Sequence, residues 1–149
     1  MTLEDLMSSE KIMIVDDEQD FIDSLSERMK IRGMKVVTAT SGNEAVELVG
    51  KSNFDAILLD MMMPGLDGLE TLKLMLSIDR DLQVIMLTGH ATVQSGVEAM
   101  KVGAKDYIEK PADIEKLVEL IRQAKIRRMV IKEKKSEEAA QEILKKRGW

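Results

Sequence analysis

The sequence predicts an α/β domain built on a five-stranded parallel sheet. Five short apolar runs, each bounded by turn or cap residues, alternate along the chain with segments that have helical spacing. Regular alternation of strand and helix favours parallel strands joined by helical crossovers. The first and third runs are almost entirely apolar, which is typical of central strands covered on both faces. With 149 residues and no cysteine, the chain is long enough for one domain with a short appendage and needs no disulfides.

The first part of the chain contains three predicted strands and two predicted helices. The strands cover residues 11–15, 34–39 and 54–59. The first helix ends at Gly33, which suits a left-handed cap. Its inward side chains are Phe21, Leu25, Met29 and Ile31. The second helix opens with the capping-box spacing of Ser41 and Glu44 and ends near Gly50.

The second part of the chain contains two predicted strands, residues 82–87 and 106–108, and three helices. The third helix begins around Gly68 and places Leu69, Leu72 and Met75 inward. The fourth covers residues 92–102, with Gly103 behind it. The fifth begins at Asp113. Its inward face consists of Leu117, Leu120, Ile121 and Ala124.

Charge and hydropathy predict a cytoplasmic protein whose acidic body does not bind nucleic acid directly. The acidic start MTLEDLMSSE has no signal-peptide pattern, and no apolar run approaches the roughly 18 residues of a membrane span. Residues 122–149 carry ten Lys or Arg and four Glu, a net charge of +6, which leaves −11 on residues 1–121. An acidic body does not suit phosphate-backbone binding, but it suits a cation site. The basic tail could bind an acidic partner or nucleic acid, although its plainest interpretation is a solvated helix.

Polar side chains follow four of the predicted strands. Asp16, Asp17 and Glu18 follow the first strand, and Asp60 follows the third, while Thr88 and Lys110 lie at the ends of the fourth and fifth. The carboxyl ends of parallel strands form the usual ligand site of such sheets. Clustered carboxylates favour a hard divalent cation such as Mg²⁺, and a hydroxyl with an ammonium can bind phosphoryl oxygens. The set therefore predicts phosphoryl transfer to a carboxylate. Taken singly, each residue has a plainer explanation as a cap, turn former or surface charge.

Four motifs at these strand ends resemble the receiver domain of two-component response regulators. They are IMIVDDE, ILLDMMMPGLDG, MLTGHAT and DYIEKP, in that order. The resemblance covers residues 10–128 and implies a flavodoxin-like (CheY-like) doubly wound sheet of order 2-1-3-4-5 with five helices. It leaves residues 1–9 as an N-terminal extension and residues 129–149 as a helical tail or linker. The stretch from MLTGHAT onward resembles the nitrogen-regulation, enhancer-binding subclass.

The resemblance implies a role for each matching residue. Asp60 matches the phosphoacceptor, and Lys110 matches the lysine that contacts a phosphoryl oxygen. Asp16 and Asp17, with Asp60 and the backbone carbonyl of Met62, match the Mg²⁺ ligands. The domain is then a signalling receiver that catalyses only its own phosphorylation and dephosphorylation.

The resemblance also implies a switch. Thr88 matches the hydroxyl that moves toward the phosphoryl group, and Tyr107 matches the aromatic residue that turns inward with it. Tyr107 alone has a plainer explanation as half-buried packing. Met62 and His90 match positions that tune hydrolysis of the acyl phosphate, and the Lys110–Pro111 peptide matches one that is cis in the family. His90 is the only histidine, so no transition-metal site is expected.

The implied donor is a phosphohistidine on a sensor histidine kinase or phosphotransfer protein. The responding face lies on the fourth helix, fifth strand and fifth helix, residues 92–124, and a homodimer through this face or the C-terminal helix is an option. The chain is either a stand-alone receiver or a piece of a longer regulator. One alternative is a phosphorylation-independent interaction module. Another, a haloacid-dehalogenase-type phosphatase, is disfavoured because its nucleophile belongs on the first strand in an Asp-x-Asp pattern.

Overall fold

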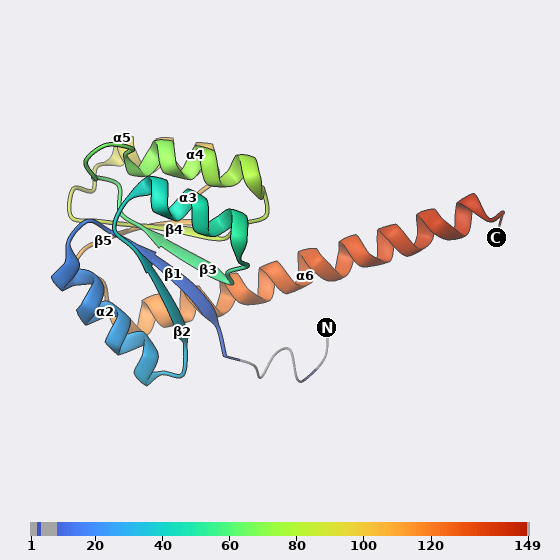
Figure 1. Cartoon of the computed structure of the whole chain (residues 1–149), viewed down its shortest axis with the longest axis horizontal. Coiled ribbons are helices and arrows are strands. Elements are labelled where there is room, and N and C mark those ends of the chain that lie inside the picture. The colour runs from blue at the N-terminus through green and yellow to red at the C-terminus, as the bar shows by residue number, and fades with distance from the viewer. Residues whose placement is uncertain (1–2, 4–8, 149) are drawn as a thin grey trace.

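A five-stranded parallel sheet forms the centre of the computed structural model, which describes residue 3 and residues 9–148 (Figure 1). The strands are β1 (Lys11–Val15), β2 (Lys35–Ala39), β3 (Ala56–Leu59), β4 (Val84–Thr88) and β5 (Asp106–Glu109). Their order in the sheet is β2-β1-β3-β4-β5, and every neighbouring pair is parallel. The predicted fold class and strand order are therefore confirmed. The predicted extension, residues 1–9, lies almost entirely outside the described residues.

Helices cover both faces of the sheet. They are α2 (Gln19–Ile31), α3 (Gly42–Lys51), α4 (Gly68–Ile78), α5 (Val93–Val102) and α6 (Ile114–Lys146). One face is covered by α3, α4 and α5, and the other by α2 and α6 (Figure 1). The predicted fourth and fifth helices are thus α5 and α6.

The core has two parts, one on each face of the sheet, because side chains alternate along a strand. In β1, Met13 and Val15 join the core under α3, α4 and α5, whereas Ile12 and Ile14 join the core under α2 and α6. All four side chains are at most 1% exposed. This two-sided burial explains why the first strand is a continuous apolar run instead of an alternating one.

One local prediction about the first two helices was wrong, and another was only partly confirmed. Ile31 does not face inward: it is 76% exposed, because it lies two residues after the buried Met29, about 200° around the helix. The capping box of α3 is only half formed. The Ser41 side chain accepts from the Glu44 N–H at 3.2 Å, but the Glu44 carboxylate accepts from the backbone of Thr40 and not from that of Ser41.

The last helix, α6, runs for 33 residues and extends well beyond the sheet (Figure 1). Three basic side chains tie it to the loop before β4. Arg127 Nε donates to Gln83 Oε1 at 2.8 Å, Arg128 pairs with Asp79 at 2.9 Å, and Lys135 pairs with Asp81. The helical extension of the predicted fold is confirmed, while a domain boundary at residue 128 stays a prediction. No helix in the described part of the chain has the length and apolarity needed to cross a membrane.

Candidate functional site

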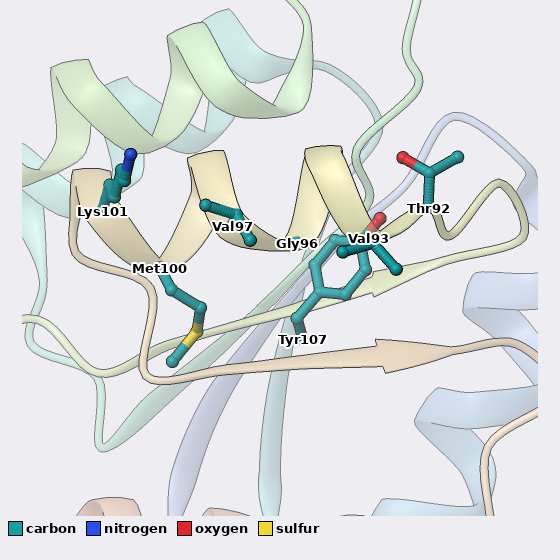
Figure 2. Close-up of a pocket in the computed structure, with 7 residues that line it drawn as sticks. All are labelled: Thr92, Val93, Gly96, Val97, Met100, Lys101 and Tyr107. Carbon is teal, nitrogen blue, oxygen red and sulfur yellow. The ribbon is translucent and has the colours of Figure 1, made fainter.

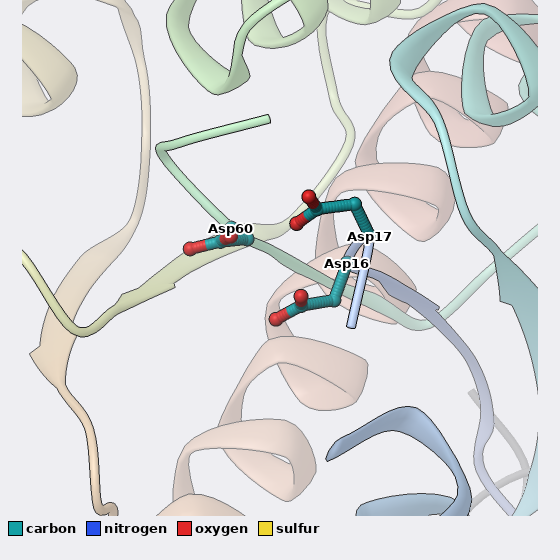
Figure 3. A group of neighbouring side chains, drawn as sticks. All are labelled: Asp16, Asp17 and Asp60. Carbon is teal, nitrogen blue, oxygen red and sulfur yellow. The ribbon is translucent and has the colours of Figure 1, made fainter. Parts of the chain in front are cut away.

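Three carboxylates meet at the carboxyl ends of the two central strands (Figure 3). Asp16 and Asp17 follow β1, and Asp60 follows β3. Ligand oxygens from the three side chains all lie within 4.8 Å of one another. Asp16 and Asp60 are buried, and Asp17 is exposed, so the cluster opens to solvent on one side. The sequence placed these residues at one edge of the sheet, and the structure brings them together.

Backbone contacts fix the position of the Asp60 carboxylate. The backbone N–H of Asp60 donates to the Val15 carbonyl at 2.9 Å, which aligns the end of β3 with the end of β1. The chain then turns back tightly, and the Gly68 N–H donates to the Met61 carbonyl at 2.9 Å. A Cβ on Gly68 would collide with the Asp60 carbonyl oxygen and the Met61 backbone, so only glycine fits this approach.

Lys110 reaches into the carboxylate cluster from the end of β5. Its Nζ lies 2.5 Å from Asp16 Oδ2 and 3.8 Å from Asp60 Oδ1. The backbone N–H of Lys110 donates to the Thr88 carbonyl at 2.8 Å, which holds the two strand ends together. The predicted cis peptide between Lys110 and Pro111 is confirmed. The Phe21 ring, from α2, has its centroid 3.9 Å from the same Nζ atom, a contact the sequence analysis missed.

The electrostatics of the site show an excess of negative charge. Burial and then the neighbouring Asp16 raise the pKa of Asp60 to about 6, against the opposing effects of Lys110 and the Met62 backbone. A single ammonium therefore does not compensate three carboxylates. An oxygen-only donor set with one open side fits a hard divalent cation such as Mg²⁺. Asp16, Asp17 and Asp60 are the side chains that would hold it.

The other predicted site residues lie around this cluster without joining it. Thr88 is fully buried at the end of β4, and its Oγ1 accepts from the His90 N–H at 3.2 Å. The side chains of Met62 and His90 are exposed on the loops after β3 and β4. Within the described residues, no hydrogen bond or ion pair joins the side chains of Thr88, Tyr107 or His90 to the carboxylates.

Tyr107 is held against the first turn of α5 (Figure 2). Its hydroxyl lies 2.5 Å from Ser95 Oγ, and its ring packs on Gly96, where a Cβ would come within 3.1 Å. Ser95 also forms a complete capping box with Thr92. The Thr92–Ser95 spacing is visible in the sequence as a capping signal, but nothing in the sequence shows that Ser95 contacts Tyr107 on β5.

An apolar groove lies beside Tyr107, between α5 and β5 (Figure 2). It has a volume of about 560 Å³. Three of its side chains, Val93, Val97 and Met100, are exposed, with Val93 at 86%. We call this feature the α5–β5 groove.

Comparison with known proteins shows the family of this chain and supports its fold. The sequence model of the response regulator receiver domain family matches residues 12–122. This match covers most of the chain and includes all five strands apart from the first residue of β1. The chain belongs to the response regulator receiver domain family. The predicted resemblance is thereby confirmed, and the domain is a signalling module of two-component systems.

A known relative of this receiver domain is longer than the chain. It is the response regulator MprA of Mycobacterium leprae, 38% identical over 112 residues, which are 75% of this chain and 49% of the relative. The chain thus spans about half the length of that relative.

Two solved structures share the receiver fold. A CheY-like receiver domain protein from Methanospirillum hungatei is 28% identical with a TM-score of 0.77, covering 82% of this chain and 98% of that one. A response regulator from Burkholderia pseudomallei, described with a phosphorylated aspartic acid, calcium ion and citrate, is 26% identical with a TM-score of 0.72. That match covers 94% of this chain and 86% of the other.

Proposed function

We propose that this receiver domain accepts a phosphoryl group on Asp60 from a phosphohistidine donor. The observation that carries the proposal is the meeting of Asp16, Asp17, Asp60 and Lys110 at one edge of the sheet. Two of the three carboxylates, Asp16 and Asp60, are buried, and Asp60 is the one that follows the central strand β3. The related Burkholderia protein described with a phosphorylated aspartic acid supports the same chemistry.

The proposed step is an in-line substitution at phosphorus. A carboxylate oxygen of Asp60 attacks the phosphorus, a P–O bond forms, and the P–N bond to the donor imidazole breaks. The released imidazole takes up a proton. Lys110 neutralises charge on a phosphoryl oxygen, and its present ion pair with Asp16 keeps the ammonium within 3.8 Å of the acceptor. Bound Mg²⁺, held by Asp16, Asp17, Asp60 and the Met62 carbonyl, would supply further charge neutralisation at the phosphoryl oxygens.

The proposed response to phosphorylation runs through Thr88 and Tyr107. A phosphoryl group adds about two negative charges and three acceptor oxygens, which favours a conformation that turns donors toward it. Thr88 lies on β4, the strand next to β3, and its Oγ1 accepts a hydrogen bond from the His90 N–H. Tyr107 moves with it in this proposal and leaves Ser95. The face formed by α5, β5 and α6, with its α5–β5 groove, would then bind the partner or output domain.

Several finer assignments are part of the proposal. The phosphoryl donor is a sensor histidine kinase or a phosphotransfer protein, and the reaction takes place in the cytoplasm. Met62 and His90 tune hydrolysis, and residues 10–128 form the receiver with 129–149 as its tail or linker. Homodimerisation and the nitrogen-regulation subclass stay predictions.

Incubation with acetyl phosphate and Mg²⁺, followed by intact mass spectrometry, tests the proposal. The wild type should gain one phosphoryl group, and it should gain none without Mg²⁺. Asp60→Ala should gain none under either condition, while Asp20→Ala, a change of an exposed aspartate in the first turn of α2, should behave as wild type. A receiver that works without phosphorylation predicts no mass gain in any sample.

A further inference from the structure

The ammonium of Lys110 is held by an aromatic ring as well as by carboxylates. Its Nζ lies 3.9 Å from the centroid of the Phe21 ring, 2.5 Å from Asp16 Oδ2 and 3.8 Å from Asp60 Oδ1. The Lys110 side chain is only 15% exposed, so the ring takes the place of water on one side of the ammonium. A cation over the face of a ring at this distance is attracted by the ring quadrupole, more strongly where water is excluded.

The position of the ring is fixed by the fold. Phe21 lies in the first turn of α2 and packs against the core formed under α2 and α6. A lysine, in contrast, has a flexible four-carbon stem with a compact charge at its end. The rigid partner in this contact is therefore Phe21, and the mobile partner is Lys110.

The two carboxylate distances give this contact a mechanistic consequence. The ammonium is closer to Asp16 than to Asp60, and we expect it to exchange its contact with Asp16 for one with a phosphoryl oxygen once Asp60 is phosphorylated. An ion pair with a single oxygen resists such an exchange, whereas a ring face attracts a cation over a broad area. The ring can thus keep the ammonium inside the site while its carboxylate partner changes.

We propose that Phe21 is a positioning residue for Lys110 during phosphoryl transfer to Asp60. The inference rests on the proposed function. It assigns the ring an electrostatic role in addition to its packing, and this role depends on the charge distribution of the ring face and not on its size.

Fluorinated phenylalanine separates the two roles, because fluorine weakens the ring face with little change in shape. The chain offers a matched control: its only other phenylalanine is Phe54, whose ring lies 5.3 Å from Lys11 Nζ at the opposite end of the sheet. The experiment places trifluorophenylalanine at position 21 or at position 54. It also uses Phe21→Leu and Phe21→Tyr, and measures the rate of phosphoryl uptake from acetyl phosphate at saturating Mg²⁺ and the Mg²⁺ midpoint of that rate.

We expect the fluorinated ring at position 21 and Phe21→Leu to slow uptake by roughly three- to tenfold, with the Mg²⁺ midpoint unchanged. Phe21→Tyr should retain the wild-type rate within about twofold, and fluorination at position 54 should have no effect. Equal rates for wild type and the position-21 fluorinated protein would overturn the inference, and so would a shifted Mg²⁺ midpoint, which indicates a distorted site. Failure of the wild type to take up phosphate would instead refute the proposed function itself.

Discussion

Lys110 and Asp16 form an ion pair with an N–O distance of 2.5 Å, although they lie 94 residues apart in the chain. The pair joins the end of β5 to the end of β1, which are separated in the sheet by β3 and β4. Asp16 is 1% exposed and Lys110 15%, so the pair is largely shielded from water. It is therefore a structural link across the site as well as a part of its proposed chemistry.

Removal of this ammonium should destabilise the protein. Lys110→Met leaves Asp16 buried without its partner, and we expect the free energy of unfolding to fall by about 2–4 kcal/mol at pH 8 without Mg²⁺. Urea denaturation measures the change. Lys73→Met, at an exposed position on α4, is the control and should change stability by less than about 0.5 kcal/mol. Equal stability of the two variants would contradict the account of the ion pair.

The raised pKa of Asp60 predicts that stability falls as the pH rises. Its pKa is about 6 in the folded chain against an ordinary value of 3.8, so between these values the folded state binds more protons than the unfolded state. Without Mg²⁺, the free energy of unfolding should therefore decrease from about pH 4 to about pH 6 because of this group. Asp60→Asn should remove this decrease and be more stable than wild type at pH 8 by about 1–3 kcal/mol. Parallel stability profiles for the two proteins would show that the pKa is not raised.

A divalent cation should offset the excess of negative charge in the carboxylate cluster. Mg²⁺ at ten times its dissociation constant stabilises a protein with one site by about 1.4 kcal/mol. We expect such stabilisation of the wild type in thermal or urea unfolding. Asp17→Asn should lose it, because Asp17 is the exposed ligand at the open side of the cluster. Asp20→Asn should keep it, and equal Mg²⁺ responses in the two variants would exclude the proposed ligand set.

Met62 should slow the hydrolysis of the phosphorylated protein. Its side chain follows Asp60 by two residues and is 56% exposed, where it can hinder an attacking water. Met62→Asn should speed decay of the acyl phosphate by roughly three- to tenfold, a change in the barrier of about 1 kcal/mol. Phosphate release after removal of acetyl phosphate measures the decay. Leu74→Asn, at an exposed apolar position on α4, should decay at the wild-type rate; an unchanged rate for Met62→Asn would leave Met62 without a tuning role.

Sequence reasoning was most successful where the topology of the sheet decides the outcome. Parallel strands bring their carboxyl ends to one edge, so the positions of Asp16, Asp60 and Lys110 in the sequence predicted their proximity. Burial on both faces of β1 and β3 was likewise visible as uninterrupted apolar runs.

Contacts that depend on side-chain direction were not predictable in the same way. The Phe21 ring was assigned to the inward side of its helix, but only the packing of α2 shows that it also faces the Lys110 ammonium. The Ser95–Tyr107 hydrogen bond depends on how closely α5 lies over β5, which Gly96 permits and the sequence pattern does not show. Ile31 was wrongly assigned to the inward face of α2. It lies only two residues after the buried Met29, whereas a helix returns to the same face after three or four residues.

The location of the phosphoryl group decides whether Asp60 is the acceptor. Borohydride reduces an aspartyl phosphate to homoserine, so the phosphorylated protein can be reduced, digested and sequenced by tandem mass spectrometry. We predict homoserine at position 60 alone, in a reaction that requires Mg²⁺. Homoserine at Asp17 or Asp16, or a stable phosphate on His90 with position 60 unmodified, would contradict it.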